Sequence, residues 1–488
     1  MHGPEVLFFR FRTWHPGGEC HEYEYSAIFL PFESCRHQCA RLPFVNTARM
    51  LRKFSEPLID WSRAKMSVQG QEYRYLSEAG RARRIAVVGA GQSGLQIAFG
   101  LLDRGYQVTL VTNRDADEIA RGKVMSSQCM FGSALDIERT AGLNWWERLC
   151  PPIEGIGLTL HDPLSPGEQT IDWAARLNKP AQSVDQRLKM AAWLDVIAKR
   201  GARIELRDAD IQVLEELSAS HDLVLLASGK GDVAKLFVRD AKRSAFDKPQ
   251  RALGMTYVHG LAPSEGFSRI SYNVIPGVGE YLVFPALTLS GPCHIMVFEG
   301  VVGGPFDCWH DAGSPAQHLA LSLALLKAYL PREYARCAHA ELTDPNGVLS
   351  GKFAPMVREP VATLPSGRLV LGLGDTVVLN DPLTGQGANG ASKCSRIYLD
   401  AIFDHGDASF TREWMTQTFE RYWQYAQYAV QWTNGMLLTP PAEAMLKLYS
   451  AAARSGPLAS AIVNAFDHPP SLFTWLSMPQ SQELHAAH

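Results

Sequence analysis

The segment that most constrains the fold is a short apolar run that stops at a glycine cluster. Ile85 to Val88 is a run of apolar, mostly β-branched residues, as in a strand that is buried on both faces. Gly89, Gly91 and Gly94 follow it as G-x-G-x-x-G. The first glycine allows a sharp turn, the second lets the backbone approach a pyrophosphate, and the third lets a helix press against the strand. The N-terminus of that helix would point at the phosphates.

A second apolar run, Gln107 to Thr112, follows at the distance expected of a β-α-β unit. This context predicts a dinucleotide site, and the alternative is a glycine-rich turn with a purely structural role. The acidic residue that binds the adenosine ribose is expected about 20 positions further on. Asn113 stands there and Asp115 lies two residues beyond it, so the ribose contact stays open.

The composition is that of an ordinary globular protein. The chain has 488 residues, 46% hydrophobic and 20% charged, which allows two or three domains with substantial cores. Its net charge of −3 gives no general attraction to nucleic acid. The nine cysteines are scattered without a repeated C-x-x-C spacing, which is typical of reduced thiols in a cytoplasmic protein. No apolar run reaches the roughly 18 residues of a spanning helix, so we expect no transmembrane segment.

Residues 1–83 differ from the rest of the chain, because aromatics, cysteines, histidines and arginines mix there without clear periodicity. We expect an N-terminal extension that is either poorly ordered or foreign to the working protein, with Met66 as an alternative start. Cys35, His37 and Cys39 lack a second pair of metal ligands, so no metal is predicted.

A capping box, Ser183 with Gln186, predicts the start of a helix. Arg187 then falls in the first turn, where the helix dipole disfavours a cation unless an anion is near. A phosphate contact and a surface salt bridge are the two interpretations. The earlier loop, 121–131, is placed where an α/β sheet presents ligand-facing loops.

Residues 222–229 form another apolar run, which we expect to return beside the first strand and close over the adenosine half of the ligand. From 249 to 298 the pattern changes to short apolar runs separated by proline and glycine turns. This change predicts an antiparallel sheet inserted between the halves of the nucleotide domain. Its apolar side chains, Phe284 among them, either wall a ligand pocket or form the core of the sheet.

A second glycine loop lies far along the chain. A strand at 369–373 ends in Gly374 and Asp375, whose carboxylate can accept hydrogen bonds from sugar-alcohol hydroxyls. Gly385 and Gly387 then present backbone N–H groups, with a helix behind them, to an anion that develops on a planar ring. The N1 and O2 edge of a reduced isoalloxazine is such an anion. Two unrelated glycine turns are the alternative, but the pairing of both motifs predicts FAD and not NAD.

Five segments resemble the oxygenase component of two-component styrene and indole monooxygenases, over about residues 84 to 470. They are RRIAVVGAGQSGLQ, DQRL at 185–188, FDKPQRAL at 246–253, GLGDTVVLNDPLTGQGANGAS at 372–392 and QWTN at 431–434. The third and fourth are the distinctive ones, because flavoproteins at large share the first. The broader relatives are the para-hydroxybenzoate-hydroxylase-like flavoproteins.

The resemblance implies an FAD-dependent monooxygenase that takes reduced FAD from a separate NADH-dependent flavin reductase. It would react with O2 through a flavin C4a-hydroperoxide and epoxidise or oxygenate an apolar aromatic alkene or an indole-like substrate. This chemistry needs a dry pocket but no metal and no strong general base. No Ser/His/Asp or paired-carboxylate arrangement stands out, so we name no catalytic residue. The alternatives are a single-component NAD(P)H-dependent aromatic hydroxylase and a non-catalytic flavin-binding redox sensor.

The resemblance also implies which residues hold the ligands. The adenosine and pyrophosphate half would meet Gly89, Gly91, Gln92, Ser93, Gly94, Asn113, Arg114 and Arg187. The ribityl chain and ring would meet Gly374, Asp375, Pro382, Gly385, Gln386, Gly387, Ala388 and Asn389. The substrate would meet Ser126, Gln128, Phe284 and Pro285.

These observations predict an α/β fold with a Rossmann-like FAD-binding domain of the glutathione-reductase type. We place that domain at 84–234 and 346–403, an inserted, mainly antiparallel substrate-binding sheet at 235–345, and a helical C-terminal region at 404–488. The aromatics of 412–430 favour packing on the flavin domain, with an interface for a reductase or a second copy, as in a homodimer, as the other interpretation.

Overall fold

The computed structural model describes residues 82–165, 167–229, 231–439 and 443–476, together with the backbone of two strands nearer the N-terminus. The chain divides into two compact units at residue 71, and each unit is described by itself.

The first unit contains an antiparallel hairpin of β1 (Val6–Trp14) and β2 (Cys20–Ile28). The remainder of the predicted extension up to residue 81 lies outside the described residues. The expectations for the cysteine and histidine cluster at 35–39 and for a start at Met66 therefore stay predictions.

The second unit contains a six-stranded sheet in the order β17-β18-β9-β3-β4-β8. Its neighbouring strands are parallel except for β17 with β18. The predicted return of a strand beside the first is confirmed, because β9 pairs with β3. The strands are β3 (Arg84–Val88), β4 (Gln107–Thr112), β8 (Arg203–Leu206), β9 (Leu223–Leu226), β17 (Val361–Thr363) and β18 (Leu369–Gly372).

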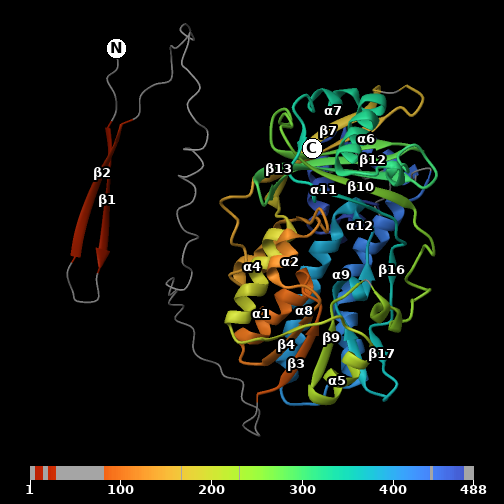
Figure 1. Ribbon diagram of the computed structural model, residues 1–488. Coiled ribbons are helices and arrows are strands. Elements are labelled where there is room, and N and C mark those ends of the chain that lie inside the picture. Colours follow the sequence, from red (N-terminus) through yellow and green to blue (C-terminus); the bar gives the residue numbers. More distant parts are fainter. Residues whose placement is uncertain are drawn as a thin grey trace. The chain divides into compact units, whose positions relative to one another are not determined.

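Successive apolar residues of β3 point to opposite faces of this sheet, so both faces have to be covered. Helices cover each of them. Ile85 and Val87 pack with buried side chains of α1, α4 and α8, whereas Ala86 and Val88 pack with those of α5. Figure 1 shows α1, α2, α4 and α8 grouped beside β3 and β4. These helices are α1 (Gln92–Asp103), α2 (Ala116–Arg121), α4 (Gln186–Lys199), α5 (Ile211–Ser220) and α8 (Gln386–His405).

A second sheet has the order β14-β10-β13-β12-β11-β6-β7-β5, with β15 also paired to β10. Its pairs are antiparallel except for β6 with β11, so the mainly antiparallel prediction is confirmed. Its strands are β5 (Cys129–Met130), β6 (Ile153–His161), β7 (Gln169–Ser183), β10 (Arg251–His259), β11 (Arg269–Ile275), β12 (Gly279–Thr288), β13 (Gly291–Val301), β14 (Glu341–Leu342) and β15 (Val348–Gly351).

Strands of this second sheet also come from outside the predicted range 235–345. β5, β6 and β7 lie in a stretch predicted to belong to the FAD-binding domain, and β6 joins the sheet by pairing with β11. A local apolar run can predict a strand but not its partner, because paired strands can be far apart in the sequence. The predicted domain boundaries stay a prediction.

The second sheet is covered on both faces by helices. Side chains of α6 (Pro315–Tyr329) pack on one face, with the short α7 (Pro331–Ala335) next to it, and side chains of α10 (Glu443–Ala452) and α11 (Gly456–Ala465) pack on the other. Figure 1 shows α6 and α7 above β12 and β10. No helix in the described residues is long and apolar enough to cross a membrane.

Helix α9 (Arg412–Met436) carries the aromatic-rich segment. Phe419 and Tyr422 are buried in the core that contains α1 and α8, so α9 packs against the helices of the six-stranded sheet, as predicted. The helical prediction for this region is also confirmed up to residue 476, where α12 (Pro470–Leu476) ends. The remaining short elements are α3 (Gly132–Thr140), β16 (Met356–Val357) and β19 (Val378–Leu379).

Candidate functional site

The first glycine cluster forms the turn between β3 and α1, and each glycine has a different environment. Gly89 has a φ of +113°, and a Cβ added there would lie 2.8 Å from the carbonyl oxygen of Ala227. A Cβ at Gly94 would lie 2.0 Å from the carbonyl oxygen of Gly89, so α1 is pressed against the turn. A Cβ at Gly91 would have no neighbour within 4 Å. Gly91 therefore borders open space at the start of α1, where no side chain caps the helix.

The second glycine loop has the same combination of left-handed turn and open space. It runs through two short 3-10 turns, Gly374–Thr376 and Pro382–Thr384. Gly385 has a φ of +65° and is the N-cap of α8, again without a side-chain cap. A Cβ at Gly387 would have no neighbour within 4 Å, and Ala388 follows in the first turn of α8. Backbone N–H groups at the start of α8 therefore border open space, as the sequence predicted.

The two glycine loops lie side by side, because α1 packs against α8. Gly374 has a φ of +60°, and a Cβ there would come within 2.7 Å of Ser93 Oγ. The Ser395 hydroxyl donates to the Ser93 carbonyl at 3.0 Å, and the Gln96 amide donates to the Ser392 carbonyl at 3.0 Å. Two turns that are far apart in the sequence therefore belong to one region of the molecule.

Asp375 lies at the carboxyl ends of β9 and β18, which are parallel neighbours. A Cβ added at Gly229, just after β9, would lie 2.5 Å from the Cβ of Asp375. Asp375 is exposed, and its backbone carbonyl accepts a hydrogen bond of 3.1 Å from Arg358. An exposed carboxylate at this edge of the sheet is placed where the predicted contact with sugar hydroxyls requires it.

The predicted adenosine contacts at the end of β4 have protein partners. Asn113 Nδ2 donates to Asp208 at 3.0 Å, and Arg114 Nη2 lies 3.1 Å from the Met125 sulfur. Asp115 is the N-cap of α2 and completes a capping box there. Both candidate ribose ligands therefore have protein partners, and the ribose contact stays a prediction.

Arg187 is buried among carboxylates. It is 1% exposed, with Nη2 2.8 Å from Asp185 and Nη1 2.8 Å from Asp344. Burial alone would lower the pKa of Arg187, but hydrogen bonds to Asp344 and Asp185 outweigh burial and raise the pKa above its usual value. Arg187 therefore forms a salt bridge, as one interpretation held, but its guanidinium is buried and not at the surface, and a phosphate contact stays a prediction.

The predicted capping box at the start of α4 is also wrong. The N-cap is Asp185, whose side chain accepts from the Arg187 N–H at 2.8 Å. Ser183 is the last residue of β7, and its hydroxyl donates to the Ser127 carbonyl at 2.7 Å. The helix therefore begins two residues later than the capping box predicted, and Ser183 belongs to the preceding strand.

Three predicted cofactor residues direct their side chains into the protein. The Asn389 side chain accepts from the Phe131 N–H at 2.8 Å, and the Gln386 amide donates to the Phe466 carbonyl at 2.9 Å. The Gln92 amide donates to a buried glutamate at 2.9 Å. All three residues are buried, so these side chains hold the glycine loops in place and leave ligand contact to the backbone.

The loop that precedes β5 holds a strained polar residue. Gln128 has a φ of +24°, which residues with a side chain rarely adopt. Its amide donates to the Val184 carbonyl, and its Oε1 is buried without a partner in the described residues. Ser126 Oγ accepts from the Gln128 N–H at 3.2 Å, and the Tyr257 hydroxyl donates to the Ser126 carbonyl at 2.8 Å. A buried acceptor without a partner is suited to a polar group of a ligand.

An apolar cluster connects this loop to the second glycine loop and the second sheet. Phe284, which precedes Pro285 on the fully buried strand β12, shares the cluster with Phe131 and Leu383. A Cβ added at Gly385 would lie 3.5 Å from the Phe131 ring. Phe131 of this cluster therefore lies beside the second glycine loop, and the substrate contacts of Ser126, Gln128, Phe284 and Pro285 stay predictions.

Two aromatic residues of this cluster were missed in the sequence. Trp432 and Phe466 have ring centroids 4.6 Å apart, and Phe466 lies 5.8 Å from Phe131. Trp432 falls in the QWTN segment, which could have identified it, whereas no local pattern marks Phe466.

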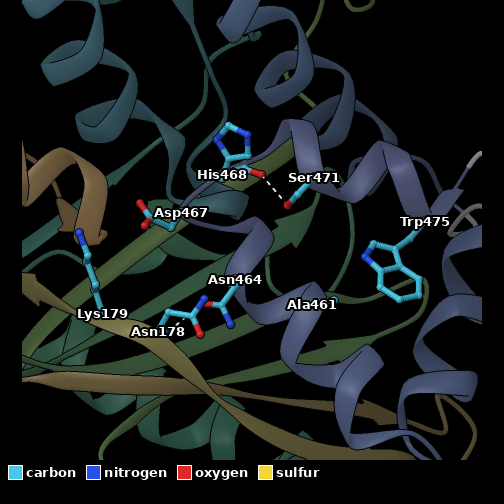
Figure 2. Close-up of a pocket in the computed structure, with 8 residues that line it drawn as sticks. All are labelled: Asn178, Lys179, Ala461, Asn464, Asp467, His468, Ser471 and Trp475. Atoms are coloured by element: carbon cyan, nitrogen blue, oxygen red, sulfur yellow. Dashed lines mark hydrogen bonds between the residues drawn. The ribbon is translucent and has the colours of Figure 1, made fainter. Parts of the chain in front are cut away.

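A cavity of about 430 Å³ lies elsewhere, beside β7, α11 and α12. Figure 2 shows Lys179, Asp467 and His468 around it, with Trp475 at one side. None of its lining residues belongs to either glycine loop. The candidate site is therefore placed at the two glycine loops, where open backbone at an uncapped helix N-terminus coincides with the segments that the sequence singled out.

The site fits an extended ligand with a diphosphate at one end and a planar, anionic ring at the other. At Gly91 and Gly387 a side chain would fill the open space. Each of the two glycines lies at the start of a helix, whose N–H groups favour negative charge. In the described part of the chain, no group of three His, Cys, Asp or Glu residues could hold a metal ion.

The chain is similar in sequence to styrene monooxygenases. Residues 229–336 match the family model of the styrene monooxygenase A substrate-binding domain. Styrene monooxygenase StyA of Pseudomonas fluorescens is 28% identical over 411 residues, which are 82% of this chain and 96% of that protein.

Solved structures of flavoproteins share the fold. A triple mutant of a flavin-dependent brominase has a TM-score of 0.58 at 14% identity, over 80% of this chain and 98% of that chain. The p-nitrophenol 4-monooxygenase of Pseudomonas putida has a TM-score of 0.54 at 12% identity, over 80% and 98%. The predicted fold class is confirmed.

Proposed function

Since this chain is an FAD-dependent monooxygenase of the styrene monooxygenase type, as its resemblance predicted, we propose that it epoxidises or oxygenates an apolar aromatic alkene or an indole-like compound. It takes reduced FAD from a separate NADH-dependent reductase and uses O2 as its second substrate. The observation that carries the proposal is the meeting of two open glycine turns beside a buried aromatic cluster.

Bound reduced FAD supplies the reactivity toward O2 and delivers the oxygen atom. The protein binds and orients it. Gly91 and the first turn of α1 receive the pyrophosphate, and Gly387 with the first turn of α8 receives the anionic edge of the ring. Asp375 accepts hydrogen bonds from the ribityl hydroxyls.

The apolar cluster keeps water away from the reacting atoms. Phe131 and Leu383 are each at most 1% exposed and lie next to the second glycine loop. An apolar substrate gains free energy from burial there, and the same side chains exclude water that would divert the oxygen into peroxide.

Gln128 directly precedes β5 and lies three residues before Phe131, and we infer that it offers this dry site one polar contact. Its buried Oε1 lacks a donor in the described residues and is suited to accept the N–H of an indole ring, which styrene does not have. This feature favours an indole-like substrate among the aromatic candidates.

The test is to mix the purified protein with reduced FAD, O2 and either styrene or indole. We expect styrene oxide or indigo. Rapid reduction of bound flavin by NADH or NADPH in the protein alone would instead identify a single-component hydroxylase. Tight FAD binding without product from any aromatic substrate would identify a flavin-binding sensor.

Two finer predictions accompany this function. The six cysteines in the described residues are free thiols, which supports a reducing, cytoplasmic location. A homodimer stays a prediction, and light scattering of the purified protein tests it.

A further inference from the structure

Four charged side chains are buried together where the second sheet meets the second glycine loop. Arg251, Glu280, Glu299 and Asp381 are each at most 5% exposed, and three of them are acids. Arg251, Glu280 and Glu299 come from β10, β12 and β13. Asp381 directly precedes Pro382 and is the N-cap of the 3-10 turn that leads to the two glycines.

Arg251 neutralises one of the acids. Its Nε lies 2.7 Å from one oxygen of Glu280 and its Nη2 lies 2.9 Å from the other, which is a bidentate pair. Arg251 also donates to the Leu437 carbonyl at 3.2 Å. Its charge is therefore largely committed to Glu280.

Glu299 and Asp381 meet as two carboxyl groups. The neighbouring Asp381 carboxyl raises the pKa of Glu299, and neither oxygen of Glu299 has a hydrogen-bond partner in the described residues. Two carboxyl groups can share a hydrogen bond only if one of them carries a proton. Burial raises the pKa of Asp381 too, but the Leu383 N–H, which donates to Asp381 at 3.2 Å, and the nearby Arg251 favour its ionised form, so we assign the proton to Glu299.

The surroundings also favour a protonated Glu299. Burial and the neighbouring Asp381 raise the pKa of Glu299 well above its usual range. Glu299 lies directly opposite Glu280 in the register of β12 and β13, where two negative charges would repel. Tyr272 and Tyr449 also face the acid cluster, and burial raises the pKa of both phenols, so they stay neutral.

We propose that Glu299 is a positioning residue: its proton, shared with Asp381, ties the second glycine loop to the substrate sheet and keeps that loop in the shape that binds FAD. This inference rests on the FAD site of the proposed function. FAD affinity then depends on one buried proton. The residue that carries this proton, Glu299, does not itself touch the ligand.

The sign of the coupling follows from the raised pKa of Glu299. Its contribution is fully present below the ordinary glutamate pKa of about 4.3 and is lost as the pH rises through the higher folded value. Above that value two adjacent carboxylates repel, and the loop moves away from β13. FAD affinity then falls by up to about tenfold for each further pH unit.

The experiment measures FAD affinity by fluorescence titration from about pH 6 to about pH 10 in the wild-type protein, in Glu299→Gln and in Glu333→Gln. The glutamine amide donates to Asp381 at every pH, so Glu299→Gln should bind FAD at neutral pH as wild type does and lose the alkaline decline. Glu333 is the matched control, because it is also mostly buried with a raised pKa but pairs with Arg336 away from the loop. The ionisation of FAD itself affects all three proteins equally, so it cannot produce a difference between them.

An alkaline decline that is the same in wild type and Glu299→Gln would overturn the inference, and so would a wild-type affinity that is flat over this range. A wild-type protein that fails to bind FAD at any pH would instead remove the proposed site. Thermal unfolding gives a second readout that needs no ligand: relative to wild type, Glu299→Gln should gain stability as the pH rises.

Discussion

The hydroxyl of Ser395 donates a hydrogen bond of 3.0 Å to the carbonyl of Ser93, and so ties the helix after the second glycine loop to the first turn of the helix after the first. This contact joins two motifs that lie far apart in the chain. It explains how a single extended cofactor can meet both of them, because α1 and α8 cannot move independently.

Gly91→Val should abolish tight FAD binding without unfolding the protein. Gly91 has a φ of −92° and ψ of −171°, which valine adopts easily, and nothing lies within 4 Å of a Cβ placed there. The new side chain fills only the space meant for the pyrophosphate. We expect FAD affinity to fall at least about tenfold, or about 1.4 kcal/mol, with an unchanged melting temperature. Gly351→Ala, which is equally open but lies on β15, is the control and should bind as wild type does.

Asp375→Ala should weaken FAD binding. A charged acceptor that meets a sugar hydroxyl contributes about 1.5–3 kcal/mol, so the loss should be roughly tenfold or more. Because Asp375 is exposed, the substitution should leave the fold intact. Fluorescence titration measures the affinity, and an unchanged value would show that the ribityl chain is held elsewhere.

Gln128→Leu should separate indole from styrene as substrates. The leucine removes the buried acceptor, together with the amide that donates to the Val184 carbonyl, and puts an apolar side chain of similar size in its place. We expect kcat/KM for indole to fall about tenfold, which corresponds to one lost hydrogen bond, whereas that for styrene changes little. Ser127→Ala in the same loop is the control. Equal losses for both substrates would mean that the variant disturbs the loop and that Gln128 does not recognise the N–H group.

Lys393→Met should change how stability depends on pH. Lys393 Nζ donates to the Tyr425 hydroxyl at 2.6 Å and to the Asp467 carbonyl at 2.9 Å, and burial lowers its pKa from 10.5 to about 8. Below about pH 8 the ammonium is charged in both the folded and unfolded states, so the full cost of burying it, roughly 3 kcal/mol, is present. The cost disappears as the pH rises to 10.5, because the folded protein then holds neutral lysine.

The measurement is the difference in unfolding free energy between wild type and Lys393→Met across this pH range. The unfolding free energy of wild type should rise relative to that of Lys393→Met as the pH rises. The exposed Lys447→Met, whose partner is Glu443 on the same helix, serves as control and should show no such slope. A difference for Lys393→Met that is constant with pH would mean that the buried amine does not titrate there.

The backbone of the site was predictable from the sequence, but the direction of several side chains was not. Gly89 forms the predicted sharp turn and Gly94 the predicted close approach of the helix, because glycine spacing reports backbone geometry, which is local, whereas the pyrophosphate contact of Gly91 stays a prediction. Asn389 and Gln386 lie in the correct loop, yet they point into the protein, because their partners Phe131 and Phe466 come from distant segments.

The buried acid pair shows the same limit more strongly. No paired carboxylates stood out in the sequence, but Glu299 and Asp381 meet in the fold, because β13 and the glycine loop are brought together only by the packing of two sheets. The helix cap at Asp185 was missed by two residues, because Ser183 is the last residue of β7 and pairs in the second sheet, which the local capping pattern does not report. Local patterns therefore predicted elements and turns, whereas pairings across the fold needed the structure.

The most direct measurement is a crystal structure of the complex with FAD. We expect the pyrophosphate against Gly91 at the start of α1 and the N1–O2 edge of the isoalloxazine against Gly387 at the start of α8, in one bound molecule. An FAD that contacts only one of these glycines, or a complex in which the two glycines bind separate ligands, would contradict the proposed site.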